Sequence, residues 1–212
     1  CKGIGVVGHR LADAGVAPSQ ALGDFLCESL FMTITNTNFD TERFVARVGQ
    51  ALEWKRGLLA QLRDRGLDRD LPEPALWDDE RARYGRKAYR TGVLQTEDAD
   101  VRSLRETITY SLKGIGAYAH HAAYLGARDP RVTAFVLRAL AAIVVESDGD
   151  RLFTLALESG KYNLLAMEQL DTVHAKTFGV PEPREIPIGV GTRPGILVSG
   201  HDLVDMRDLL EQ

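Results

Sequence analysis

A short segment of this 212-residue chain occurs twice, 111 positions apart, and the repeat constrains the fold more than any other feature. Lys2-Gly3-Ile4-Gly5 returns as Lys113-Gly114-Ile115-Gly116, and at the same offset His9 matches His120. Each copy continues through a glycine stop and a proline-containing turn into a second apolar helix, which indicates duplication rather than chance identity. We therefore expect two similar helical bundles, with repeat halves at about 1–65 and 101–176.

Apolar residues recur every three or four positions over most of the chain, a spacing typical of amphipathic helices. Capping residues mark where several of these helices begin: Ser19, Asp40, and Asp129 followed by Pro130. We predict that residues 1–180 form a duplicated helical domain of mainly α structure. Residues 66–99 are highly charged and weakly periodic, and we interpret them as the linker between the halves.

The character of the chain changes after Gly179, where prolines and glycines accumulate. We predict that residues 181–212 begin as an irregular connection, after which Ile196-Leu197-Val198 forms a short buried strand. A turn at 199–202 and a helix over Leu203 to Leu210 complete a strand-turn-helix, the first half of a βαβ unit. A lone parallel strand lacks a partner for its backbone groups, so we interpret this part as the start of a truncated α/β domain.

Composition excludes several classes of protein. The chain carries 26 basic and 30 acidic residues, a net charge of −4, with the two signs interspersed, which argues against a nucleic-acid partner. The longest apolar stretch, 134–145, is interrupted by Arg138, and no signal peptide is visible, so we expect no membrane partner. Cys1 and Cys27 form no CxxC pair, which favours a reducing cytoplasm as the compartment of the protein. We interpret Cys27 as a small buried apolar residue.

The chain contains no nucleophile elbow, phosphate-binding glycine loop or metalloprotease helix, and its catalytic residues stay unknown. His9 and His120 occupy twinned places in the repeat, which predicts a shared packing role, whereas we expect His121 and His174 to face solvent. His201 differs because it follows the predicted strand, at the end of an α/β sheet where ligands bind. A neutral imidazole there can bind a metal, and a structural or capping role is the alternative.

The run Pro194-Gly195-Ile196-Leu197-Val198-Ser199-Gly200-His201-Asp202-Leu203 closely resembles the hybrid cluster proteins, also called prismane proteins or hydroxylamine reductases. The resemblance extends, in the family's order, to 35–40, 112–122 and 178–183, and it is weakest at 66–99. It implies that the first domain consists of two three-helix bundles and that an α/β domain follows. It also implies an iron–sulfur oxidoreductase that reduces small nitrogen species such as hydroxylamine and nitric oxide.

The same resemblance implies the cofactors. Family members hold a hybrid iron–sulfur–oxygen cluster on one histidine, two glutamates and several cysteines, and that histidine falls on His201. A conventional iron–sulfur cluster is implied on cysteines upstream of residue 1, whereas Cys1 matches an ordinary apolar position. The remaining hybrid-cluster ligands would follow residue 212. We therefore expect this chain alone to bind no cluster and to be inactive, because a multinuclear cluster needs thiolates.

The implied partners are the remainder of the same polypeptide and a redox protein. Two alternative functions stay open. One is a carbon monoxide dehydrogenase relative, whose architecture is similar and which also uses a histidine after such a strand. The other is a cofactor-free helical interaction module derived from the enzyme. The runs at 36–40 and 199–202 favour the hybrid cluster family over carbon monoxide dehydrogenase.

Overall fold

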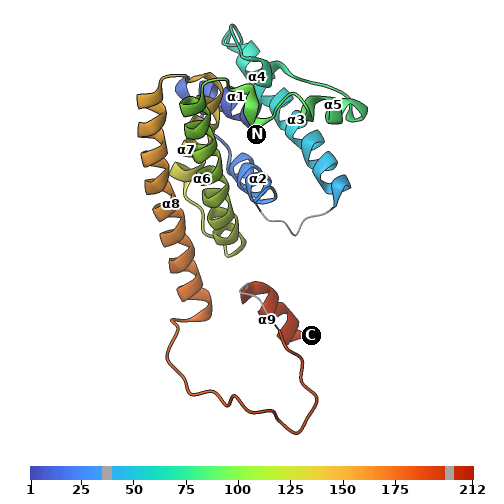
Figure 1. Ribbon diagram of the computed structural model, residues 1–212, viewed down its shortest axis with the longest axis vertical. Coiled ribbons are helices and arrows are strands. Elements are labelled where there is room, and N and C mark those ends of the chain that lie inside the picture. Colours follow the sequence, from blue (N-terminus) through green and yellow to red (C-terminus); the bar gives the residue numbers. More distant parts are fainter. Residues whose placement is uncertain (35–39, 199–202) are drawn as a thin grey trace.

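The computed structural model describes residues 1–34, 40–198 and 203–212, and in these ranges the chain is built from helices (Figure 1). The prediction of a mainly α protein is confirmed. The longer helices are α1 (Lys2–Asp13), α2 (Gln20–Phe31), α3 (Thr41–Asp64), α6 (Ala99–Tyr124), α7 (Pro130–Val145), α8 (Gly149–Phe178) and α9 (Leu203–Glu211). Between α3 and α6 lie four short elements, α4 (Glu73–Leu76), η1 (Arg81–Arg83), α5 (Tyr84–Ala88) and η2 (Val93–Gln95).

The predicted capping residues begin helices as expected. The Ser19 side chain accepts a hydrogen bond from the backbone N–H of Leu22, and the Asp129 side chain accepts one from the N–H of Arg131. Asp40 does the same at the start of α3. Each of these bonds satisfies an N–H that the first turn of a helix leaves without an intrahelical acceptor.

The main helices pack in crossed pairs, α1 against α7 and α2 against α6, while α8 lies along α6 and α3 along α1. Glycine makes two of these contacts possible. A Cβ at Gly5 in α1 would lie 2.4 Å from the Cβ of Leu140 in α7, and a Cβ at Gly116 in α6 would lie 2.9 Å from the carbonyl oxygen of Cys27 in α2. Because Gly5 and Gly116 are 111 positions apart, the same glycine of each copy contacts the second helix of the other copy.

The two copies also end their first helix in the same way. Gly15 and Gly126 both have a positive φ, 82° and 84°, a conformation that glycine adopts without steric cost. The following residues, Val16 and Ala127, donate their N–H groups back to the carbonyls of Leu11 and Ala122. These paired features support our proposal that residues 1–180 are a duplicated domain with halves at about 1–65 and 101–176.

One hydrophobic core runs through both halves. Its most buried side chains come from α1, α2, α3, α6 and α7, among them Ile4, Leu26, Leu62, Ile115 and Phe135. The charged linker between the halves is attached to this core by Leu71 and Ala75, which are 9% and 0% exposed. Part of the linker is therefore packed against the helices.

The strand predicted at Ile196–Val198 is not confirmed. Within the described residues the structure contains no strand, and Ile196 and Leu197 are 93% and 95% exposed. A strand requires a hydrogen-bonded neighbour, and this part of the chain offers none. The helix predicted after the turn is present as α9, which lies apart from the other helices at the end of a long loop (Figure 1). The turn itself, 199–202, lies outside the described residues.

None of the helices in the described ranges is both long and apolar enough to cross a membrane.

Candidate functional site

His201, the predicted metal ligand, lies outside the described residues, and its role stays a prediction. The residues that flank the segment are half-exposed: Val198 is 45% exposed and Leu203, the first residue of α9, is 42% exposed. Elsewhere in the described ranges, no three histidine, cysteine or carboxylate side chains gather in a group that could hold a metal ion.

His120 lies in a cluster of aromatic rings near the C-terminal ends of α2 and α6. Its ring centroid is 5.6 Å from that of Phe31 and 5.3 Å from that of Tyr124, and His121 packs edge-on against Phe31 at 5.2 Å. Burial lowers the pKa of His120 below its ordinary value, and the nearby charge of Glu28 opposes this shift. His120 is therefore a packed imidazole, in agreement with its predicted packing role.

An arginine from α3 attaches that helix to α2 beside the histidine cluster. The Nε of Arg47 donates to the Oγ of Ser29 at 2.8 Å, and its guanidinium forms a 2.5 Å ion pair with Glu28. The same guanidinium lies 4.3 Å from the ring centroid of Phe25. The charges of Arg47 and Glu28 thus neutralise each other, and this contact between α3 and α2 is structural.

The other sequence candidates have ordinary environments. His9 is partly buried, and its Nδ1 lies 3.5 Å from the Oδ1 of Asp13, one helical turn away. His121 and His174 are less exposed than predicted, because each packs against a phenylalanine. Cys27 is 5% exposed, as predicted, and burial raises the pKa of its thiol to about 12, which makes the thiol unreactive.

Lys55, which the sequence analysis did not single out, is 3% exposed in the middle of α3. Its Nζ donates to the carbonyl oxygens of Pro74, at 3.4 Å, and of Trp77, and it lies 5.7 Å from the Trp77 ring centroid. Burial lowers the pKa of Lys55 to about 8. Because its hydrogen bonds go to backbone carbonyls, this ammonium holds the linker against α3. The available signal was its position on the apolar face, three residues after Leu52 and four before Leu59.

A pocket of about 720 Å³ opens beside Lys55, between α1, α3 and the linker. Its wall includes Trp77, Tyr84, Lys87 and Arg90. The charge of Lys87 is already engaged, since its Nζ lies 2.5 Å from a carboxylate oxygen of Glu73. The wall thus combines aromatic rings with cations that are partly neutralised by the chain itself.

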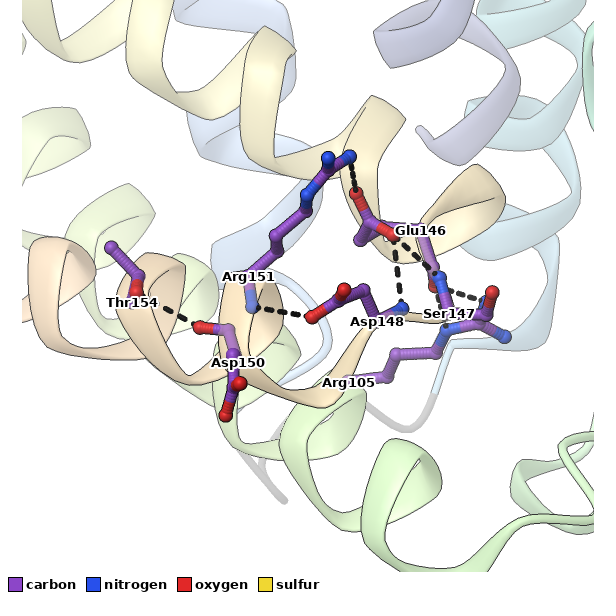
Figure 2. A network of polar contacts seen from close by, with 7 residues as sticks. All are labelled: Arg105, Glu146, Ser147, Asp148, Asp150, Arg151 and Thr154. Carbon is purple, nitrogen blue, oxygen red and sulfur yellow. Dashed lines mark hydrogen bonds and ion pairs between the residues drawn. The ribbon is translucent and has the colours of Figure 1, made fainter.

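Between α7 and α8, the carboxylates of Glu146 and Asp148 accept hydrogen bonds from nearby backbone N–H groups (Figure 2). The Glu146 carboxylate accepts the N–H groups of Ser147 and Asp148 at 3.0 and 2.9 Å, and these bonds hold its pKa below the usual range. Asp148 caps α8 by accepting the N–H of Arg151 at 3.1 Å, and Arg105 of α6 donates to the carbonyl oxygen of Glu146. These carboxylates form a helix start that also attaches α6, rather than a cation site.

The described donor set therefore does not by itself fit an iron–sulfur cluster. It contains two cysteines, one exposed and one buried with an unreactive thiol, and they do not converge with other ligands. What the described residues build is a helical scaffold in which no buried side-chain nitrogen or oxygen lacks a hydrogen-bond partner.

Comparison with known proteins gives a consistent result. The model of the Prismane/CO dehydrogenase family matches residues 1–212. The hydroxylamine reductase of Desulfitobacterium hafniense (strain Y51) is 42% identical over 215 residues, and that of Nitratidesulfovibrio vulgaris is 39% identical over 218 residues. A third, from Bacteroides thetaiotaomicron, is 39% identical over 212 residues. Each alignment covers 100% of this chain but only 38–39% of the relative, so the chain spans about two fifths of the length of these proteins.

Proposed function

This chain belongs to the Prismane/CO dehydrogenase family, and on that premise we propose that it is part of an iron–sulfur oxidoreductase acting as a hydroxylamine reductase. One observation carries the proposal: similarity to three hydroxylamine reductases extends over the whole chain at about 40% identity. The substrates are then small nitrogen species, hydroxylamine and nitric oxide. A redox protein supplies the electrons, and two unpaired cysteines favour a reducing compartment, the cytoplasm.

Within that enzyme we propose that residues 1–180 form the helical domain and that 181–212 lead into an α/β domain. His201 is the residue of this chain proposed to bind the hybrid cluster. The glutamate and cysteine ligands would come from the polypeptide beyond residue 212, and the conventional cluster from cysteines upstream of residue 1. The cluster would supply the electrons for reduction of the nitrogen substrate, and this chain would contribute one imidazole and the scaffold that carries it.

A matched pair of histidine variants in the longer enzyme tests this proposal. His201→Ala should remove or distort the hybrid cluster and strongly lower hydroxylamine reduction while the helical content stays unchanged. His120→Ala should destabilise the fold, because a packed ring is lost, and leave the cluster spectra nearly intact. A His201→Ala enzyme with a native electron paramagnetic resonance spectrum and native turnover would refute the assignment.

The cofactor content of the chain itself is a second test. After anaerobic reconstitution, the 212-residue chain should contain no stoichiometric iron and show no thiolate charge-transfer absorption, because its thiols do not converge. Stoichiometric iron with such absorption would mean that its ligands were misjudged. In the longer enzyme, carbon monoxide oxidation in place of hydroxylamine reduction would favour the carbon monoxide dehydrogenase alternative. An iron-free protein would favour the interaction module.

A further inference from the structure

The long helix α8 has two apolar faces on opposite sides. The inner face packs against α6 and α7 with residues that are at most 8% exposed: Leu152, Leu155, Ser159, Ala166 and Val173. The other face carries large side chains in solvent: Phe153 at 56%, Leu157 at 62%, Leu164 at 67% and Met167 at 44% exposure. Figure 1 shows α8 at the outer edge of the bundle, where nothing else in the described chain covers its far side. We call this second face the outer seam.

The spacing of the outer seam is that of a helix–helix contact. Together with Gly160, its residues fall at successive intervals of four, three, four and three positions, which is the repeat of a coiled-coil seam. The solvent side of a surface helix is normally polar, so a row of large apolar side chains is not expected on a face that is in contact with water alone.

Gly160 adds an independent observation at the centre of the seam. A Cβ at this position would meet nothing within 4 Å, so no contact inside the chain requires glycine in the middle of this 30-residue helix. Elsewhere in this chain, Gly5 and Gly116 lie where another helix approaches too closely for a side chain. Gly160 likewise has no side chain, so within the outer seam it leaves room for a helix that is not part of the described chain to approach closely.

The length of the relatives favours one occupant over a second copy of the chain. About three fifths of each hydroxylamine reductase lies outside the region that this chain matches. Residues 179–198 lead from the end of α8 to α9, and α9 also carries exposed apolar side chains, Leu209 at 50% and Leu210 at 78%. A segment joined to α8 by such a tether meets it at a far higher effective concentration than a separate molecule does.

We infer that the outer seam of α8 (Phe153, Leu157, Gly160, Leu164 and Met167) is the docking surface for a helix of the same polypeptide beyond residue 212. This inference rests on the proposed function, because it requires the longer enzyme. The seam thereby joins the helical domain to the part of the protein that would hold the cluster.

Thiol accessibility tests the inference. Leu164→Cys places a thiol in the seam, and Thr172→Cys places one on an exposed position of α8 outside it. Both are made in a Cys1→Ser background, in the 212-residue chain and in the longer enzyme, and both fall in the tryptic peptide 162–176. Isotope-coded alkylation followed by mass spectrometry of that peptide gives each rate, whatever the other cysteines do. Met167→Cys serves as a second seam variant.

In the 212-residue chain the seam and control thiols should react at similar rates. In the longer enzyme the seam thiols should react at least about tenfold more slowly than the Thr172→Cys control at every protein concentration, because alkylation then requires the contact to open. Equal rates in the longer enzyme would overturn the inference. Protection in the 212-residue chain that grows with concentration would also overturn it, in favour of a second copy. Iron content and hydroxylamine turnover of the unmodified enzyme are measured separately, so a failed docking surface is distinguished from a failed proposed function.

Discussion

Replacing Gly5 by alanine tests whether the close crossing of α1 and α7 determines the stability of the fold. The added Cβ would lie 2.4 Å from the Cβ of Leu140, 3.0 Å from its carbonyl carbon and 3.1 Å from the N of Ala141. These atoms belong to the backbone of α7 or are fixed to it, so no flexible side chain can move aside. The clash is relieved only when the two helices move apart.

The expected magnitude follows from two opposing terms. Overpacking of a tight contact costs about 1–3 kcal/mol, whereas alanine in place of glycine stabilises a helix interior by up to about 1 kcal/mol. Gly57 in α3 provides the matched control, because it is exposed and a Cβ there would meet nothing within 4 Å. Gly57→Ala should therefore keep the gain, and Gly5→Ala, with the full gain subtracted from its overpacking cost, should lose about 0–2 kcal/mol of unfolding free energy overall.

The two variants should thus differ by the overpacking cost alone, about 1–3 kcal/mol, or about 2–12 °C in melting temperature for a chain of this size. Urea and thermal unfolding of the 212-residue chain, followed by far-ultraviolet circular dichroism, measure the difference. If Gly5→Ala is as stable as Gly57→Ala, the crossing is not tight in solution and the reasoning is wrong. Gly116→Ala, at the corresponding crossing of α6 and α2, should behave like Gly5→Ala.

Two further predictions concern the core and pH. Phe135 is 1% exposed, and its ring centroid lies 4.0 Å from that of Tyr162, on which it stacks. Phe135→Ala should therefore lower the unfolding free energy of the chain by about 3–5 kcal/mol. Phe153 is exposed, so Phe153→Ala should leave the unfolding free energy of the 212-residue chain nearly unchanged. If urea titrations show the same loss of unfolding free energy for Phe135→Ala and Phe153→Ala, Phe135 is not part of the core. Burial lowers the pKa of Lys55 to about 8 from 10.5, so between these values the unfolded chain binds a proton that the folded chain has released. The unfolding free energy should therefore rise from pH 8 to 10.5, less so in Lys55→Met, and parallel pH profiles would show that Lys55 is not desolvated.

Helices were predictable from the sequence because their determinants are local. Ser19 and Asp129 bond to N–H groups two or three residues away, and the positive φ of Gly15 and Gly126 is one that glycine adopts without steric cost. The strand at 196–198 is not confirmed, for the opposite reason. Its apolar run is a valid signal, but a strand exists only when a second strand lies beside it, which no local pattern supplies.

The same distinction explains what was found at the candidate site. The repeat correctly marked His120 as a packed residue, since packing follows from its place on a helix face. Lys55 was missed because the carbonyls that hold it, from Pro74 and Trp77, belong to a linker whose path is not encoded by periodicity. The sequence motif around His201 supports a ligand role through resemblance, and that role stays a prediction.

The crossed pairing of helices has a consequence for how the scaffold carries the rest of the enzyme. Gly5 of the first half contacts α7 of the second, and Gly116 of the second contacts α2 of the first, so each half completes its packing with a helix of the other. Since one core runs through both, we expect the halves to unfold together rather than as separate units. α8 lies along α6 at the edge of this shared core and leads into residues 179–198. The double unit with one long helix at its edge thus offers a surface, the outer seam, on the same helix that leads the chain out of the helical domain.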